Sequence, residues 1–132
     1  MKSYIYPFEK LEVWKISQDL VKETYEIVSD FPTTEKYNIN SQIKRAVISI
    51  SSNLAEGAGR ASKADRAHFT NIAYTSALEC MSLILVSERL GFINCEACKA
   101  YREKMNLLTN KINSYYKYQI SNGNHLRDTK IQ

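Results

Sequence analysis

The sequence predicts an all-α domain folded as an antiparallel up-down four-helix bundle. Apolar residues recur at helical spacing through most of the chain, and only two prolines and four glycines interrupt it. The connections between the expected helices are short, which favours antiparallel neighbours. With 132 residues, 44% of them hydrophobic, the chain is long enough for one domain with its own core. We expect a lead-in over residues 1–8, the bundle over 9–120 and a mobile polar tail over 121–132.

The first helix is expected over residues 9–30. Its apolar half faces the core, and its polar half alternates acidic and basic residues, such as Lys15 and Asp19, at a spacing that predicts ion pairs along the helix. Phe31 and Pro32 end this helix, because a proline disfavours the helical conformation of the residue before it.

The second helix is expected over residues 41–57, with Asn40 or Ser41 as its cap. We expect it to end at Gly57-Ala58-Gly59, because glycine tolerates the left-handed conformation that closes many helices. One narrow edge of this helix carries a cation, two small hydroxyls and an anion: Arg45, Ser49, Ser52 and Glu56. We expect another helix to approach this edge closely, with Arg45 and Glu56 satisfying each other at its two ends.

The third helix, over residues 63–90, is expected to start with a capping box formed by Ser62 and Asp65. It is apolar on two sides. Its second apolar stripe consists of Tyr74, Leu78, Met81 and Leu85. Such a helix exposes hydrophobic surface unless a partner covers it, so we predict that this stripe is an oligomer interface. The alternative is that the first or fourth helix of the same chain covers both sides.

The fourth helix, over residues 95–120, is expected to follow a Gly91 cap and to begin at Asn94. The formal net charge of +4 is concentrated here: residues 1–98 carry 11 basic and 12 acidic side chains, and residues 99–132 carry 7 and 2. Basic and amide side chains together suit phosphate contacts. The predicted nucleic-acid-binding residues are Lys99, Arg102, Lys104, Lys111 and Lys117, extended by Lys44, Arg60, Lys63 and Arg66. The alternative is an ordinary solvated lysine face.

Catalytic and metal chemistry find little support in the sequence. Cys95 and Cys98 form a single C-x-x-C pair without the β-α-β context of a redox motif or the further ligands of a zinc site. Gly57–Arg60 follows a helix, whereas phosphate loops follow a strand. We therefore expect no enzyme activity, no metal and no cofactor.

The cellular setting follows from cysteine count and hydropathy. Three cysteines give an odd number without disulfide spacing, and no secretory or membrane-spanning segment is recognisable. We expect a soluble cytoplasmic protein without a membrane partner.

Several motifs together resemble one known family. Phe8–Trp14 (FEKLEVW), Gln42–Val47 (QIKRAV), Ser49–Gly57 (SISSNLAEG) and Arg60 resemble the four-helix-bundle proteins encoded in intervening sequences of 23S ribosomal RNA genes, over roughly residues 8–120. The resemblance implies an up-down bundle, a ring-shaped homopentamer and no catalytic activity. The accessory proteins of diversity-generating retroelements are similar, and are thought to contact nucleic acid and a reverse transcriptase through a basic surface.

The residues that match the family pattern are interpreted as polar packing and assembly positions: Arg45, Asn53, Glu56, Arg60, Ser76 and Glu79. The chain departs from the pattern at Ser51, where proline is frequent, and at Thr75, where glycine is usual. We predict a non-enzymatic oligomer that binds structured RNA or DNA electrostatically. The alternative is a protein-binding scaffold, or an accessory subunit that recruits a nucleic-acid enzyme.

Overall fold

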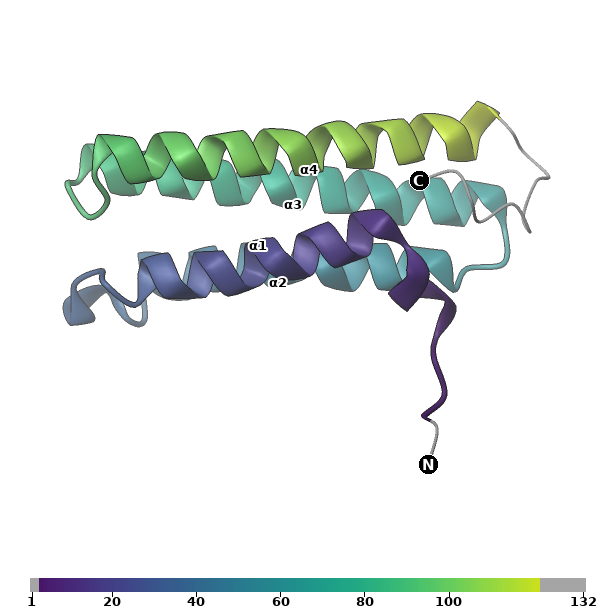
Figure 1. Ribbon diagram of the computed structural model, residues 1–132, viewed down its shortest axis with the longest axis horizontal. Coiled ribbons are helices and arrows are strands. Elements are labelled where there is room, and N and C mark those ends of the chain that lie inside the picture. Colours follow the sequence, from purple (N-terminus) through teal and green to yellow (C-terminus); the bar gives the residue numbers. More distant parts are fainter. Residues whose placement is uncertain (1–2, 122–132) are drawn as a thin grey trace.

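The computed structural model describes residues 3–121, which form four α-helices and two short 3-10 helices without any strand in that range. The α-helices are α1 (Glu12–Val28), α2 (Ile39–Ala58), α3 (Lys63–Arg89) and α4 (Cys95–Ser121). The 3-10 helices are η1 (Pro7–Lys10) and η2 (Thr33–Glu35). Successive helices run in opposite directions (Figure 1). Ser121, where the expected tail begins, is still part of α4, and the rest of that tail, residues 122–132, lies outside the described residues.

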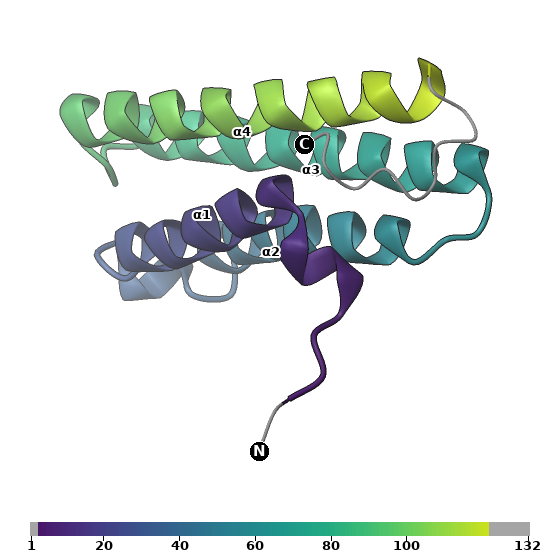
Figure 2. The ribbon, with the colours of Figure 1, turned by 45° about the vertical axis from the view of Figure 1, so that its right-hand side comes forward.

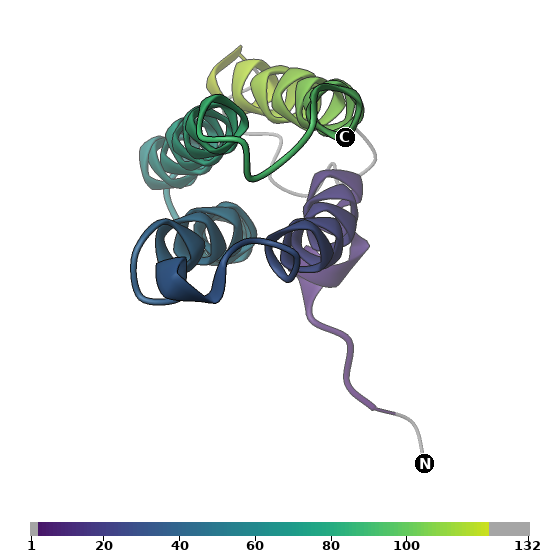
Figure 3. The same cartoon turned by 90° about the vertical axis from the view of Figure 1, so that its left-hand side faces the viewer.

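The four helices stand at the corners of a rough square when viewed along the bundle (Figure 3). Each helix lies beside its neighbour in the chain, and α4 returns to the side of α1 (Figures 2 and 3). The first described residues leave the bundle near the start of α1 and point away from all four helices.

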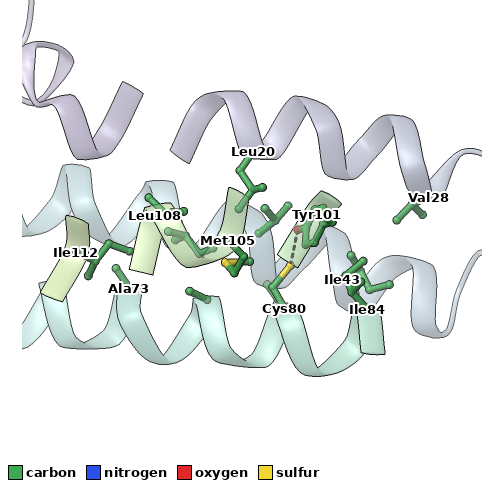
Figure 4. Packing of buried hydrophobic residues seen from close by; sticks show 14 of the residues in the cluster. Leu20, Val28, Ile43, Ala73, Cys80, Ile84, Tyr101, Met105, Leu108 and Ile112 are labelled. Atoms are coloured by element: carbon green, nitrogen blue, oxygen red, sulfur yellow. Dashed lines mark hydrogen bonds between the residues drawn. The ribbon is translucent and has the colours of Figure 1, made fainter. Parts of the chain in front are cut away.

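The core runs along the axis between the four helices. Leu20 of α1, Ile43 of α2, Ile84 of α3 and Leu108 of α4 are all buried in it (Figure 4). Each helix presents its apolar residues on one side at helical spacing, so their burial follows directly from the sequence pattern. Burial of these side chains is the main favourable contribution to stability.

α1 begins three residues later than the sequence suggests. Pro7–Lys10 form the tighter 3-10 turn, and Leu11 then adopts an extended conformation with φ −73° and ψ 123°. This change of direction buries the Leu11 side chain, which is 6% exposed. The lead-in is therefore an ordered part of the fold from η1 onward.

α2 begins two residues before the expected residue 41, and it ends within the expected Gly57-Ala58-Gly59 segment, although without a left-handed glycine. α2 begins at Ile39, and Asn40 does not cap it: its side chain is buried and donates a hydrogen bond to the Pro32 carbonyl at 3.4 Å. α2 continues through Gly57 to Ala58, and Gly59 has φ −92°, outside the left-handed region. A β-carbon on Gly57 would lie 2.8 Å from Cβ of Phe69. Gly57 is thus needed for the close approach of α3, not for helix termination.

The remaining caps agree with the sequence. The Ser62 hydroxyl accepts a hydrogen bond from the Asp65 amide at 3.1 Å, and the Asn94 side chain accepts one from the Ala97 amide at 2.8 Å. Gly91 has φ +81°, a conformation that favours glycine. These contacts satisfy backbone groups that helix ends leave free.

By length and composition alone, α3 is long and apolar enough to cross a membrane. The core helix of a bundle meets the same criterion. One side of α3 packs here on α2 and α4, where Ala73, Ala77, Cys80 and Ile84 are fully buried.

Candidate nucleic-acid interface

α4 separates its residues into a buried face and a polar outer face. Tyr101, Met105, Leu108 and Ile112 point into the core (Figure 4). The opposite side carries a line of exposed basic and amide side chains, which we call the α4 stripe: Lys99, Arg102, Asn106, Asn110, Asn113 and Lys117. These residues recur at three- and four-residue steps, so they share one face. The stripe extends over 19 residues, from Lys99 to Lys117, and its ends are roughly 27 Å apart at a rise of 1.5 Å per residue.

Two of the predicted basic residues of α4 are engaged by α1 instead. Lys104 pairs with Glu23, and Nζ of Lys111 lies 2.7 Å from Oε1 of Glu12. Both lysines lie on the flank of α4 that faces α1. Their charges are therefore partly neutralised, and they serve the contact between the first and last helices.

The ion pairs of α1 differ from those that the sequence predicts. Among the described residues, Lys15 forms no ion pair with Asp19, whereas Glu12 and Glu23 reach across to α4. Sequence spacing identified the charged side of α1 but missed its partners, because it describes neighbours within a helix and not between helices.

The basic residues outside α4 are mostly held by local contacts. The Arg60 guanidinium lies 3.7 Å from the Glu56 carboxylate and 4.4 Å from the centre of the Phe69 ring. Arg66 donates hydrogen bonds to the carbonyls of Arg60 and Ala61, at 2.8 and 3.0 Å, and so fixes the turn between α2 and α3. These two arginines stabilise the turn.

Lys44 and Lys63 differ in their surroundings. The Lys44 ammonium lies 5.0 Å from the centre of the Tyr25 ring, a cation-π distance. Lys63 is exposed in the first turn of α3. Burial raises the pKa of Tyr115 on α4, and the charge of nearby Arg66 opposes this rise. The start of α3 and the end of α4 lie at the same end of the bundle (Figure 1). Lys63 and Lys117 therefore belong to the same end of the bundle.

The nine predicted basic residues thus form two groups. Five take part in contacts within the chain: Lys44, Arg60, Arg66, Lys104 and Lys111. Four are exposed and have no such contact with another residue of the range 3–121: Lys63, Lys99, Arg102 and Lys117. Exposed Glu103 lies beside this surface and reduces its positive charge locally. The candidate interface is narrower than the sequence suggests, with basic residues at both ends and three asparagines between them.

The predicted oligomer stripe on α3 is partly covered by the chain itself. Tyr74, Met81 and Leu85 are half-buried against the core, and Leu78 is 50% exposed. Val86, elsewhere on α3, and Leu90, directly after its end, are 45% and 56% exposed. Leu78 is therefore the residue of the stripe with most surface left for a partner.

Part of the predicted polar motif lies in the contact between α2 and α3, and the rest is exposed. The hydroxyls of Ser49 and Ser76 lie 2.8 Å apart, and Asn53 donates to the Ser49 carbonyl at 2.8 Å. Glu56 pairs with Arg60 and not with Arg45. Arg45 and Glu79 are exposed.

Two of the three cysteines, Cys80 and Cys98, are buried packing residues. Cys98 is buried and Cys95 exposed, and burial, with Glu88 nearby, raises the pKa of the Cys98 thiol. Cys80 lies 3.3 Å from the Tyr101 hydroxyl. Residues 3–121 contain no group of three or more histidine, cysteine or acidic side chains able to hold a metal ion.

One surface was missed by the sequence analysis, a mainly apolar groove of about 280 Å³ between α1 and α2. Trp14 and Ile48 contribute to its two walls. The lining residues are Phe8, Trp14, Gln18, Val21, Ile48, Ser51, Ser52 and Ala55. The available signal was Ile48, which lies outside the core stripe of α2.

Comparisons with known proteins identify the family. The model of the 23S rRNA-intervening sequence protein family matches residues 9–114. The chain belongs to this family. A solved structure from Bacteroides thetaiotaomicron, described as a protein of unknown function from the S23 ribosomal protein family, is similar with a TM-score of 0.74. It is 22% identical, and the match covers 80% of this chain and 98% of that one, so it supports the fold. The chain has no significant match among curated proteins.

Proposed function

We propose that this family member is a non-enzymatic, self-associating helical bundle that binds structured RNA or DNA through the α4 stripe and Lys63. The observation that carries the proposal is the exposure of Lys99, Arg102 and Lys117 along one face of α4 while neighbouring lysines are engaged with α1. Cations attract phosphates, and the intervening asparagines offer hydrogen bonds to phosphates, sugars or bases.

Self-association would strengthen the attraction of the protein for nucleic acid, because each copy adds its own positive charge. One chain has a formal net charge of +4, and five copies would carry +20 in the ring that the family resemblance implies. Several α4 stripes on one particle would also contact one nucleic acid at several points, which raises the overall affinity.

The binding test uses a fluorescent RNA hairpin and the corresponding DNA hairpin, with anisotropy measured over a range of salt concentrations. Wild-type protein is expected to bind, with affinity falling steeply as salt rises. The triple variant Lys99→Glu, Arg102→Glu, Lys117→Glu is expected to lose binding. Its control, Lys10→Glu, Lys15→Glu, Lys22→Glu, makes the same charge change at exposed residues of η1 and α1 and should retain most of the affinity. Equal loss in both variants, or salt-independent binding, contradicts the proposal.

The self-association test uses light scattering. Leu78→Glu introduces a charge at a half-exposed position, so the isolated bundle should remain folded while an interface through α3 is lost. Leu85→Glu should have the same effect but also destabilise the chain, because Leu85 packs against the core. A wild-type protein that is monomeric at every concentration contradicts the self-associating part of the proposal.

The exposed apolar residues of α3 favour a second candidate function, a scaffold for another protein. This scaffold would recruit a nucleic-acid enzyme. In nuclease-treated extract, the wild type should then recover a defined partner protein, and Leu78→Glu should not. This result would support the scaffold function over direct nucleic-acid binding.

A further inference from the structure

Four aromatic rings form a continuous row from the N-terminal segment to the α1–α2 groove: Tyr4, Tyr6, Phe8 and Trp14, which we call the aromatic ladder. Neighbouring ring centres are 5.0, 5.9 and 5.0 Å apart, which are ordinary distances for aromatic pairs. The segment that carries the first two rings leaves the bundle near the start of α1 (Figures 1 and 3), and these rings belong to side chains that are 74% and 57% exposed. The ladder therefore presents apolar ring surface to the solvent.

The ladder is fixed where this segment joins the bundle. The Tyr6 amide donates to the Glu9 carboxylate at 2.7 Å, and the Glu9 amide donates to the Tyr6 carbonyl at 3.0 Å. Pro7 favours an extended conformation at Tyr6, observed at φ −73° and ψ 147°. The rings of Tyr6 and Phe8 are inclined by only 19° and are nearly parallel. A ligand that stacks on Tyr6 meets a ring that is already in place, which reduces the entropy lost on binding.

The ladder ends in the α1–α2 groove, where Trp14 and Ile48 contribute to the two walls. The exposed side chains of Gln18 and Ser52 also line the groove, and they can form hydrogen bonds with the polar edge of a flat ring. The volume of about 280 Å³ lies just below the range of pockets for drug-sized ligands. The groove therefore suits a single ring system with a polar edge.

The rim of the groove carries an excess of positive charge. α1 and α2 contain four basic residues, and each lies three or four positions from a residue that lines the groove: Lys15, Lys22, Lys44 and Arg45. This spacing places them on the flanks of the groove. Within residues 3–121, none of the four forms an ion pair with a carboxylate, and three carboxylates of the same helices pair with other cations: Glu12, Glu23 and Glu56. That leaves Asp19 and Glu26 against four cations.

Aromatic rings and cations together select the kind of ligand. An apolar peptide would fill the groove without using the cations, and a duplex carries charge but keeps the faces of its bases covered. An unpaired nucleotide has both a flat ring for stacking and a phosphate for the cations. A basic groove with aromatic side chains is typical of sites that bind single strands.

We propose that the aromatic ladder and the α1–α2 groove bind an unpaired segment of single-stranded nucleic acid. Its bases stack on the rings of Tyr4 and Tyr6 and beside Trp14 in the groove, and its phosphates lie near the cations of the rim. The site is separate from the α4 stripe and requires neither that stripe nor self-association, so it goes beyond the proposed function. A hairpin offers few unpaired bases, and its binding should depend on the stripe.

Trp14 is the only tryptophan in the sequence and lines the groove, so quenching of its fluorescence reports a base stacked there. The probe is a short oligothymidylate, a strand without stable secondary structure. Its matched control is a strand of the same length with abasic residues, which keeps the phosphates and lacks the rings. The oligothymidylate is expected to quench the fluorescence to saturation, and the abasic strand is expected to bind about tenfold more weakly or less.

Variants of the ladder and of the groove test the two parts of the site, with binding measured by the anisotropy of a labelled oligothymidylate. Tyr6→Ser removes an exposed ring and is expected to weaken binding about tenfold. Its control, Tyr37→Ser, removes an 87% exposed ring from the connection between α1 and α2 and should bind as the wild type does. Ile48→Glu places a negative charge in the groove and should weaken binding, whereas Val86→Glu makes a similar change at a similarly exposed position of α3 and should not. Circular dichroism confirms that each variant is folded.

The two triple variants of the hairpin test separate this site from the α4 stripe. The stripe variant should lose the hairpin and keep most of its affinity for the oligothymidylate. Its control on η1 and α1 reverses two cations of the rim, Lys15 and Lys22, and should keep the hairpin and bind the oligothymidylate more weakly.

The proposal is overturned if the abasic strand binds as tightly as the oligothymidylate, if Tyr6→Ser and Ile48→Glu bind as the wild type does, or if the stripe variant alone loses the oligothymidylate. A wild type that binds the oligothymidylate but not the hairpin contradicts the proposed function and supports this site.

Discussion

The contact between α2 and α3 and the contact between α1 and α4 use different physical means. α2 meets α3 through small residues: Gly57 leaves no room for a β-carbon beside Phe69, and the hydroxyls of Ser49 and Ser76 lie 2.8 Å apart. The close fit of small residues therefore determines how α2 and α3 pack. A change of volume should therefore matter more here than a change of pH or salt.

α1 meets α4 through long polar side chains. Glu12 pairs with Lys111, Glu23 with Lys104, and the Thr24 hydroxyl lies 2.7 Å from that of Tyr101. Tyr101 also contacts Cys80 of α3, and so joins three helices at one buried point (Figure 4). The α2–α3 contact therefore depends on close packing, whereas the α1–α4 contact depends on hydrogen bonds and charge. Substitutions can test the two contacts separately.

The largest effect is expected for Gly57→Ala. The new β-carbon would lie 2.8 Å from Cβ of Phe69, an atom that cannot move without its helix. We expect the free energy of unfolding to fall by about 1–3 kcal/mol, despite the better helix propensity of alanine. Urea denaturation measures this change.

The matched control is Gly59→Ala. A β-carbon there would lie 3.6 Å from the Glu56 carbonyl, an ordinary contact, and φ is −92°. Stability should stay the same or rise by about 0.4–1 kcal/mol, because alanine restricts the unfolded chain. If the two variants have equal stability, close packing does not define the α2–α3 contact.

The next effect is the loss of stability in alkaline solution. Burial raises the pKa of the Cys80 thiol from 9.0 to about 11. The folded chain holds this proton more tightly than the unfolded chain, so the stabilisation is complete below pH 9 and is lost as pH rises toward 11. Each such group lowers the free energy of unfolding by about 1.4 kcal/mol per pH unit in this window. Urea denaturation at several pH values measures the slope.

Other buried groups act in the same direction. Burial also raises the pKa of Cys98 and of Tyr101, so both add to the alkaline loss. Cys80→Ala should make the decline above pH 9 shallower, whereas Cys95→Ser, at an exposed position, should leave it unchanged. An unchanged slope in Cys80→Ala contradicts the role assigned to this thiol.

The fold could be predicted from the sequence because helical periodicity is a local property. The caps at Ser62 and Asn94 depend on residues three positions apart, and both form as expected. Gly57 was misinterpreted because its role depends on Phe69, a residue of the next helix. The start of α1 was misplaced because Leu11 turns to bury its side chain, which no local pattern indicates.

The candidate site was less predictable for the same reason. Periodicity placed Lys99, Arg102 and Lys117 on one outer face, where the structure has them exposed. It did not show that Lys104 and Lys111 reach α1, because ion pairs between helices depend on the packing angle and register of the bundle. The α1–α2 groove needs two helices and η1 in place, so no single segment reveals it.

A smaller effect is expected when the buried polar contact is removed. Tyr101→Phe deletes the hydroxyl that lies near Thr24 and Cys80, while Thr24 keeps its hydrogen bond to the Leu20 carbonyl at 2.6 Å. We expect a loss of about 1 kcal/mol, since the Thr24 hydroxyl keeps its acceptor and only the weak S–H donor of Cys80 loses its partner. Thr24→Val and the double variant complete a cycle, and a coupling energy near zero would show that the two hydroxyls do not interact.

The smallest effect on stability is expected for the ion pairs between α1 and α4. The side chains of Glu23 and Lys104 are 36% and 54% exposed, and such pairs contribute about 0.2–1 kcal/mol, less at high salt. A double-mutant cycle with Glu23→Gln and Lys104→Met, measured by urea denaturation at low and high salt, gives the coupling. A coupling that is independent of salt would contradict an electrostatic contact.

The same carboxylates have a larger expected effect on binding than on stability. Glu12→Gln together with Glu23→Gln frees Lys111 and Lys104, beside the α4 stripe, at little cost to the fold. Hairpin affinity at low salt should therefore rise in this variant, and its salt dependence should steepen, because two more cations can displace counterions from phosphates. Glu26→Gln with Asp30→Asn makes the same charge change at exposed residues that form no ion pair with α4, and should raise affinity less. If both variants bind equally, net charge governs binding and the α4 stripe has no special role.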